Sequence, residues 1–205
     1  MLSIYKIKPK FQQLLRPVLV QLHKRGISAN QITLASILLS AVIGILFWYA
    51  GEHRIFFLAL PIGLFIRMAL NALDGMMART YNQQSKKGEI LNETGDIISD
   101  LFIFFPLLKY EPENMYLIVI FLSLSILNEF AGILAKAVSG ERRYDGPMGK
   151  SDRAFVIGLY GLLQYFKVDF SAYSTWIFGM LILLILLSTY TRLHKSLKNE
   201  TIIRK

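Results

Sequence analysis

The stretch NALDGMMARTYNQQSKKGEILNETGDIISD, residues 71–100, sets polar side chains at helical spacing between apolar segments. On one helix, a single face would carry Arg67, Asn71, Asp74 and Ala78. After a short polar connection over 80–87, a second stripe carries Glu89, Glu93, Asp96 and Asp100, with Asn92 at its edge. We therefore expect two adjacent antiparallel helices whose polar faces meet.

The surrounding sequence is far more apolar than that of a soluble domain. Hydrophobic residues make up 54% of the 205 residues and charged residues 18%, against about 45–50% and about 25% in soluble proteins. A membrane-spanning helix needs about 20 mostly apolar residues. Such runs cover 26–51, 55–73, 90–108, 115–138, 154–166 and 170–191. We predict an all-α integral membrane protein with six transmembrane helices, in which the short run 154–166 could instead be buried or re-entrant.

The net charge of +9 follows the positive-inside rule rather than a nucleic-acid interface. With six spans, 19 of the 23 basic residues fall on one side, so both termini are expected to be cytoplasmic. The long apolar runs exclude nucleic acid as a partner. Since the sequence has no cysteine and only three histidines, we expect neither a thiolate site nor a histidine metal cluster.

The N-terminal segment has no signal-peptide pattern, because charges interrupt its apolar residues. Residues 11–22, FQQLLRPVLVQL, instead have the spacing of an amphipathic helix lying on the membrane surface. A solvated helix packed on the rest of the protein is the alternative. We predict a single domain over 1–205, with a cytoplasmic amphipathic segment at 1–29, a six-helix membrane domain at about 30–192 and a basic cytoplasmic tail at 193–205.

The acidic residues inside the predicted spans indicate a metal site. Ionisable groups are costly in a membrane and usually serve a function. Asn71 lies eight residues before Arg79, and Asp96 eight residues after Gly88, so both lie about 12 Å below the membrane surface. Oxygen ligands from two helices suit Mg²⁺ or Mn²⁺.

The alternative is a structural ion-pair network. We disfavour it because three acids within eight residues exceed what one or two arginines would neutralise. Arg67 and Glu129 are the exception, and we expect them to form a structural pair between the second and fourth spans.

The same residues resemble the signature of the CDP-alcohol phosphotransferase family, D-x-x-D-G-x-x-A-R, eight residues, G-x-x-x-D-x-x-x-D. The matching residues are Asp74, Gly75, Ala78, Arg79, Gly88 and Asp96. The resemblance is to phosphatidylglycerophosphate synthase-like members, and it implies six transmembrane helices after an amphipathic helix, and a homodimer. ISANQIT, residues 27–33, resembles the family turn T-P-N-x-x-T with Ala29 in place of proline, which makes Asn30 and Thr33 further candidates beside Gly88.

Two positions depart from the signature, because Asn71 and Asn92 replace its first and third aspartates. The resemblance implies that Asp74 binds metal and that Asp96 is both a metal neighbour and the base that deprotonates the attacking alcohol. Asparagine carbonyls can still ligate a hard cation, but two negative charges are lost. We expect Glu93 or Asp100 to supply missing charge, with one or two Mg²⁺ or Mn²⁺ ions bound.

The resemblance also implies the substrates. CDP-diacylglycerol would be the donor and CMP the leaving group, in phospholipid synthesis at a bacterial inner membrane. The CDP moiety would be held by Asn71, Asp74, Gly75, Ala78 and Arg79. A small alcohol is the acceptor, and it would carry a phosphate, as glycerol 3-phosphate does, if four basic residues converge: Arg142, Arg143, Lys150 and Arg153.

Three other interpretations stay open. Those four basic residues could simply follow the positive-inside rule. The two asparagines could mark a catalytically impaired membrane scaffold or regulator on the same fold. A transporter is disfavoured because no inverted repeat is evident.

Overall fold

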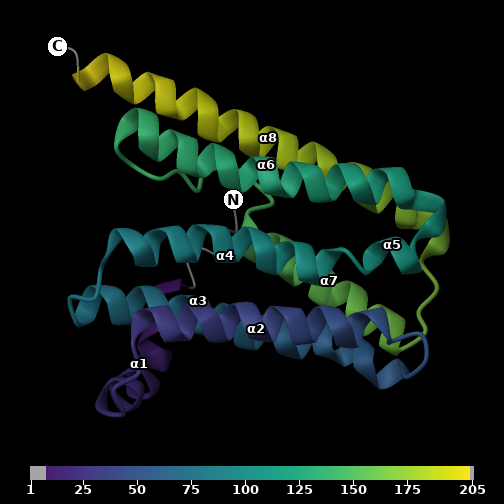
Figure 1. The fold of residues 1–205 in the computed structure, drawn as a ribbon. Coiled ribbons are helices and arrows are strands. Elements are labelled where there is room, and N and C mark those ends of the chain that lie inside the picture. Colours follow the sequence, from purple (N-terminus) through teal and green to yellow (C-terminus); the bar gives the residue numbers. More distant parts are fainter. Residues whose placement is uncertain (1–7, 204–205) are drawn as a thin grey trace.

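The computed structural model describes residues 8–203, and no strand occurs among them. The helices are α1 (Lys8–Lys24), α2 (Ala29–Trp48), the 3₁₀ turn η2 (Arg54–Leu58), α3 (Ala59–Thr80), α4 (Lys86–Phe104), α5 (Leu107–Tyr110), the 3₁₀ turn η3 (Pro112–Asn114), α6 (Met115–Ser139), α7 (Lys150–Tyr165) and α8 (Ser171–Ile203). The all-α prediction is confirmed for this part of the chain (Figure 1).

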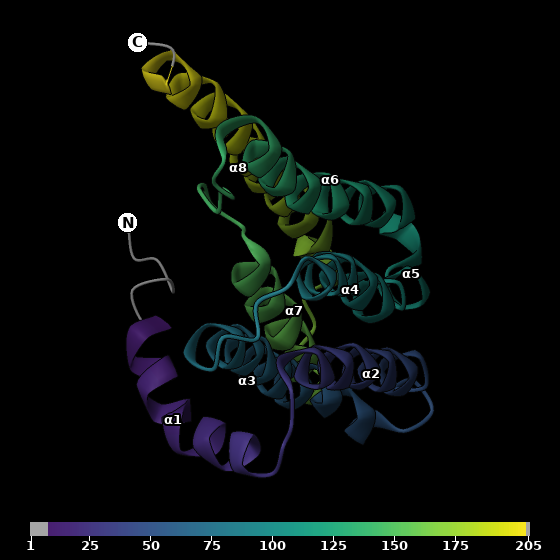
Figure 2. The same cartoon turned by 60° about the vertical axis from the view of Figure 1, so that its left-hand side comes forward.

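The long helices form two groups. α2 packs against both α3 and α4, and α7 packs against α3, whereas α6 pairs with α8. Figures 1 and 2 show the α6–α8 pair on one side of the molecule and α2, α3 and α4 on the other. The α3–α4 connection lies at the same end as α1, and α5 lies at the opposite end (Figure 1).

Local sequence signals explain where the helices of the site begin and end. Ser28 caps α2 in a capping box with Gln31. Ser85 caps α4 by accepting a hydrogen bond of 3.0 Å from the backbone N–H of Gly88. Gly140 ends α6 with a left-handed φ of 78°, a conformation that costs glycine little.

Small residues allow the helices to approach closely, as is usual between helices in membranes. A Cβ on Gly44 of α2 would lie 2.2 Å from the backbone oxygen of Phe102 on α4, so any larger residue would push these helices apart. A continuous apolar core joins the two helix groups, with Phe104 of α4 against Phe121 of α6, and Phe121 against Phe178 of α8.

Four helical segments are long and apolar enough to cross a membrane. They are Ala29–Trp48, Arg54–Thr80, Pro112–Ser139 and Ser171–Leu197. Large apolar side chains on them face outward, including Phe65 at 60% and Trp176 at 79% exposure. The protein is therefore an integral membrane protein. α4 and α7 fall short of this standard, because α4 carries several charges and α7 has only 16 residues.

The two ends of the chain differ in part from the sequence prediction. α1 includes the predicted helix 11–22, and its Leu19 is buried against Leu73 and Met77 of α3, while Leu14 is exposed. This face is packed on the protein, as in the alternative interpretation. At the other end, α8 continues as a helix through Ile203, past the expected start of a tail at 193, because neither glycine nor proline occurs in 193–203. Lys6, Arg204 and Lys205, part of the predicted cytoplasmic charge, lie outside the described residues.

Candidate active site

Asp74 lies at the junction of three helices. Its carboxylate is buried on α3, and its Oδ2 atom accepts hydrogen bonds of 3.0 Å from Thr33 Oγ1 of α2 and 3.0 Å from Asn92 Nδ2 of α4. The structure thus brings together three residues that were singled out from separate parts of the sequence. The polar faces of α3 and α4 thus meet through these side chains, as expected. The two helices are not packed directly on each other, however, because α2 packs against both of them.

Asn71 lies one turn away on the same face of α3. Its Oδ1 atom accepts a hydrogen bond of 2.7 Å from Ser36 Oγ of α2. Sequence reasoning missed Ser36, although it lies three residues after Thr33 and therefore on the same face of α2. Both asparagines that replace signature aspartates, Asn71 and Asn92, are therefore hydrogen-bonded within the protein.

Asp96, the second aspartate retained from the signature, forms an ion pair with Lys150. Lys150 is the first residue of α7. The side chains are 14% exposed for Asp96 and 23% for Lys150. The start of α7 therefore meets the polar face of α4 at the predicted base.

The remaining signature residues lie at the end of α3 and the start of α4. Arg79 is exposed, and its Nη1 atom lies 3.3 Å from where a Cβ on Gly75 would stand. Ala78 packs against the small core beneath α1. A Cβ on Gly88 would lie 2.7 Å from Asn30 Oδ1, so these two candidates are in contact.

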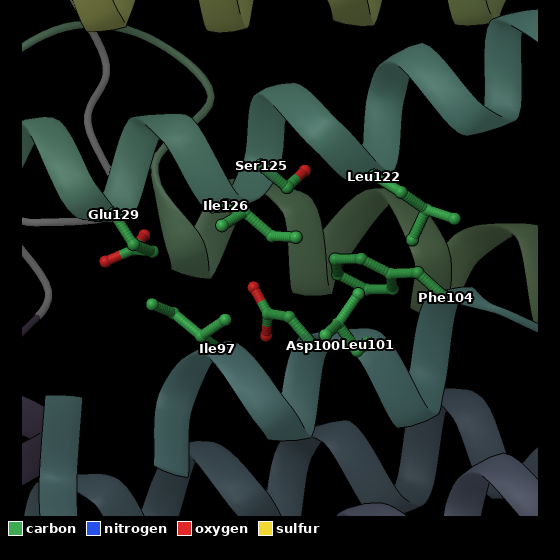
Figure 3. Close-up of a pocket in the computed structure, with 8 residues that line it drawn as sticks. All are labelled: Ile97, Asp100, Leu101, Phe104, Leu122, Ser125, Ile126 and Glu129. Atoms are coloured by element: carbon green, nitrogen blue, oxygen red, sulfur yellow. The ribbon is translucent and has the colours of Figure 1, made fainter. Parts of the chain in front are cut away.

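A network of buried ion pairs lies beside these residues, and it corrects the expected partner of Arg67. Arg67 pairs with Asp100 at 2.8 Å, not with Glu129. Arg153, which is fully buried, bonds to both acids, at 2.9 Å to Asp100 and 2.8 Å to Glu129. Figure 3 shows the carboxylates of Asp100 and Glu129 turned into the same small pocket between α4 and α6.

Arg142 extends the network toward the loop between α6 and α7. It pairs with Glu129 at 2.9 Å and also with Glu93 of α4. Three arginines and Lys150 thus meet the acids of α4 and α6, more than the one or two assumed from the sequence. The reason for disfavouring an ion-pair network was therefore wrong for Glu93 and Asp100.

The four basic residues predicted to bind the acceptor lie at the same end of the molecule, but most of them form ion pairs with acidic side chains of the protein. Arg142 and Arg153 lie in the buried network, and Lys150 contacts Asp96. Arg143 is partly exposed, with Asp145 3.9 Å away. These basic side chains therefore converge mainly on carboxylates of the protein itself.

A basic residue that sequence reasoning did not single out holds the loop between α6 and α7. Arg192 of α8 donates to the backbone oxygens of Asn128 at 2.6 Å and Asp145 at 3.3 Å. Nothing in the sequence beyond its place near the end of a span pointed to this role. A Cβ on Gly146 would lie 2.5 Å from the Cα of Ser188, so the loop packs tightly on α8.

The sequence matches the CDP-alcohol phosphatidyltransferase family over residues 27–194. The chain belongs to this family of enzymes. It is 53% identical to Inner membrane protein YnbA of Escherichia coli (strain K12), over 78% of this chain and 80% of that protein. It is 35% identical to Archaetidylinositol phosphate synthase of Pyrococcus horikoshii, over 49% of this chain and 50% of that one.

Solved structures of the phosphatidylinositol phosphate synthase PgsA1 of Mycobacterium tuberculosis share the fold. The form with CDP-DAG bound superposes with a TM-score of 0.74 at 21% identity, covering 90% of this chain and 94% of that chain. The form in complex with manganese and citrate gives 0.72 at 21% identity, covering 88% and 87%. The family indicated by the signature is thus confirmed, as is an all-α fold shared with these structures.

The residues of this phosphatidyltransferase fit one divalent cation better than two. Among the residues that the structure describes, no three His, Cys, Asp or Glu side chains are grouped to hold a metal. Asp74 and Asp96 are the carboxylates retained from the signature, and the Asn71 carbonyl adds a neutral oxygen. Glu93 and Asp100 are paired with arginines, which limits their use as replacement ligands.

Proposed function

We propose that this family member transfers a phosphatidyl group from CDP-diacylglycerol to a small alcohol and releases CMP, as a step of phospholipid synthesis. The observation that carries the proposal is that both retained signature aspartates, Asp74 and Asp96, lie among polar side chains at one end of the bundle. The CDP-DAG bound to the PgsA1 structure of the same fold supports the donor.

The placement in the membrane is part of this proposal. Six helices, α2, α3, α4, α6, α7 and α8, would span a bacterial inner membrane with both termini in the cytoplasm. α4 and α7 can do so despite their charges or length, because their polar groups are paired within the bundle rather than facing lipid. The exposed face of α1 would lie on the membrane surface, and the protein would form a homodimer, which light scattering in detergent tests.

The residues divide the work as follows. Asp96 accepts the proton of the attacking hydroxyl, for which a carboxylate in a largely desolvated position is suited. Asn71, Asp74, Gly75, Ala78 and Arg79 hold the CDP moiety, with the exposed guanidinium of Arg79 facing phosphate. A Mg²⁺ or Mn²⁺ ion held by Asp74, Asp96 and the Asn71 carbonyl would neutralise pyrophosphate charge.

The acceptor would carry a phosphate. Lys150, at the start of α7, offers a cationic group beside the predicted base, and the partly exposed Arg143 offers another in the loop before α7. Glycerol 3-phosphate is one candidate, and the names of the synthases similar to this chain add an inositol phosphate. If Arg143→Met leaves the acceptor KM unchanged, Arg143 has no part in this site.

The assay is CMP release by the protein purified in detergent. It uses CDP-diacylglycerol, Mg²⁺ or Mn²⁺ and a panel of acceptors that includes glycerol 3-phosphate and an inositol phosphate. We expect release with at least one acceptor, and its loss in Asp96→Asn. Lys136→Met is the matched control, because the pair that Lys136 forms with Glu89 of α4 is exposed and Lys136 itself is not a signature residue.

A membrane scaffold or regulator is the second candidate. It is favoured by one observation: Asn92 bonds to Asp74 and Lys150 to Asp96, so protein groups already satisfy both retained aspartates. No CMP release across the panel, together with Asp96→Asn indistinguishable from wild type in cells, would favour the scaffold over the transferase.

A further inference from the structure

The charge at the signature residues is unusually low for a site that binds two divalent ions. Asn71 and Asn92 remove two negative charges, leaving Asp74 and Asp96. Hard cations are bound chiefly by carboxylates. The negative charge of the carboxylates at the site therefore limits how many ions the site can hold.

The structure offers no replacement among the nearest acids. Asp100 lies between Arg67 and Arg153 at 2.8 and 2.9 Å. Glu93 pairs with Arg142. Releasing Asp100 to bind metal would leave the buried Arg67 guanidinium without a carboxylate partner, which is strongly unfavourable. Releasing Glu93 would leave Arg142 with Glu129 alone, an acid that Arg142 already shares with Arg153.

One signature carboxylate, Asp96, is paired with a cation of the protein itself, Lys150. The Lys150 ammonium group contacts Asp96 Oδ1. Its backbone is fixed at the start of α7, where Asp152 caps the helix by accepting a hydrogen bond of 3.0 Å from the Gly149 N–H. Arg153, one turn along, is fully buried, so the fold holds Lys150 in this position.

We propose that Lys150 is a built-in cation of this site, which takes the electrostatic place of a second divalent ion. The site then binds one Mg²⁺ or Mn²⁺. An ammonium group is a compact charge with three donors and needs only one carboxylate partner, so it suits a site that has lost two carboxylates. The inference rests on the proposed transferase, because it concerns the metal that this reaction would use.

This role differs measurably from that of an acceptor-binding lysine. A lysine that only binds acceptor phosphate changes the acceptor KM and leaves metal binding unchanged. A built-in cation repels the ion that shares Asp96 with it, so its removal strengthens metal binding. The measurement needs neither CDP-diacylglycerol nor an acceptor.

The experiment is Mn²⁺ titration of the full-length protein in detergent, followed by the electron paramagnetic resonance of free Mn²⁺. We expect wild type to bind one ion per chain. Lys150→Met should bind its ion at least about tenfold more tightly, because a unit charge a few ångströms away is removed. Lys150→Arg keeps the charge and should resemble wild type. Lys136→Met, the exposed pair with Glu89, is the control and should not change affinity.

A triple variant provides a second test of the proposal. Asn71→Asp and Asn92→Asp combined with Lys150→Met restore the four-carboxylate set without the lysine, and this protein should bind two ions. Each variant is first checked by circular dichroism and size-exclusion chromatography.

Two ions or none in wild type, or equal affinity in Lys150→Met and wild type, would overturn the proposal. Absence of CMP release with the expected ion counts would instead count against the transferase alone, so the two failures are distinguishable.

Discussion

Buried carboxylates lie at both ends of the bundle, but they meet different partners. At the end with the signature residues, Asp100 and Glu129 are bonded by arginines. At the opposite end, Glu111 accepts hydrogen bonds from neutral groups: Tyr160 Oη at 3.2 Å, Asn114 Nδ2 at 3.2 Å, and Ser174 Oγ. The same kind of side chain is thus satisfied by charge at one end and by hydrogen bonds at the other.

The difference indicates what each end can do. The neutral cluster joins η3 to α7 and α8, since Asn114 also accepts a hydrogen bond of 2.7 Å from Thr175 Oγ1. The groups that donate to Glu111 in this cluster, Tyr160, Asn114 and Ser174, are neutral. The ionic end holds separate cations and anions, so an anionic substrate or a metal ion can exchange with one partner of a pair. We therefore propose that the chemistry takes place at the ionic end and that the neutral end supports the structure.

The largest expected effect separates the two ends by activity. Asp96→Asn should lower the rate of CMP release by about 10²- to 10⁴-fold, the usual contribution of a positioned base. Glu111→Gln, at the neutral end, should keep the wild-type rate once its folding is verified. Equal losses in the two variants would mean that the ends do not differ in function.

Arg153→Met should produce the largest loss of stability. Arg153 is fully buried between Asp100 and Glu129, and its removal leaves two buried carboxylates short of a partner. We expect a loss of about 3–5 kcal/mol in the free energy of unfolding, measured by denaturant unfolding in detergent. Arg143→Met is the control and should cost far less, because Arg143 is partly exposed and 3.9 Å from its partner.

Tyr160→Phe sharpens the comparison at the neutral end. It removes the hydroxyl that donates to Glu111 and accepts from Gln164. A lost hydrogen bond of this kind costs about 1–3 kcal/mol when its partner stays buried. The same unfolding measurement should show this loss, with CMP release unchanged. A fall in activity at full folding would assign the neutral end a part in the reaction.

The smallest effect is expected for Lys136→Met. Its pair with Glu89 is about half exposed on both sides, at 44% and 49%. Exposed ion pairs contribute about 0–1 kcal/mol, so stability and CMP release should both match wild type closely. A larger loss would mean that the ionic network extends to the surface of α4.

The sequence predicted the parts of the site that depend on spacing along one helix. Asn71 and Asp74 share a face of α3, as the helical period requires, and the matched signature led to the correct family. The partners of the charged groups were not predictable in this way. Arg67 was assigned to Glu129, but Asp100 of α4 is its partner. Periodicity tells which side of a helix is polar, and not which neighbouring helix that side meets.

The sequence by itself determined that this protein is a helical membrane protein of the CDP-alcohol phosphatidyltransferase family, because apolar runs and a fixed motif are local properties of the chain. Only the tertiary structure decided which acids are engaged. Lys150 reaches Asp96 across 54 residues of sequence, and Arg153 reaches Asp100 across 53. Such pairs form because a buried charge must find an opposite charge wherever the packing of helices supplies one.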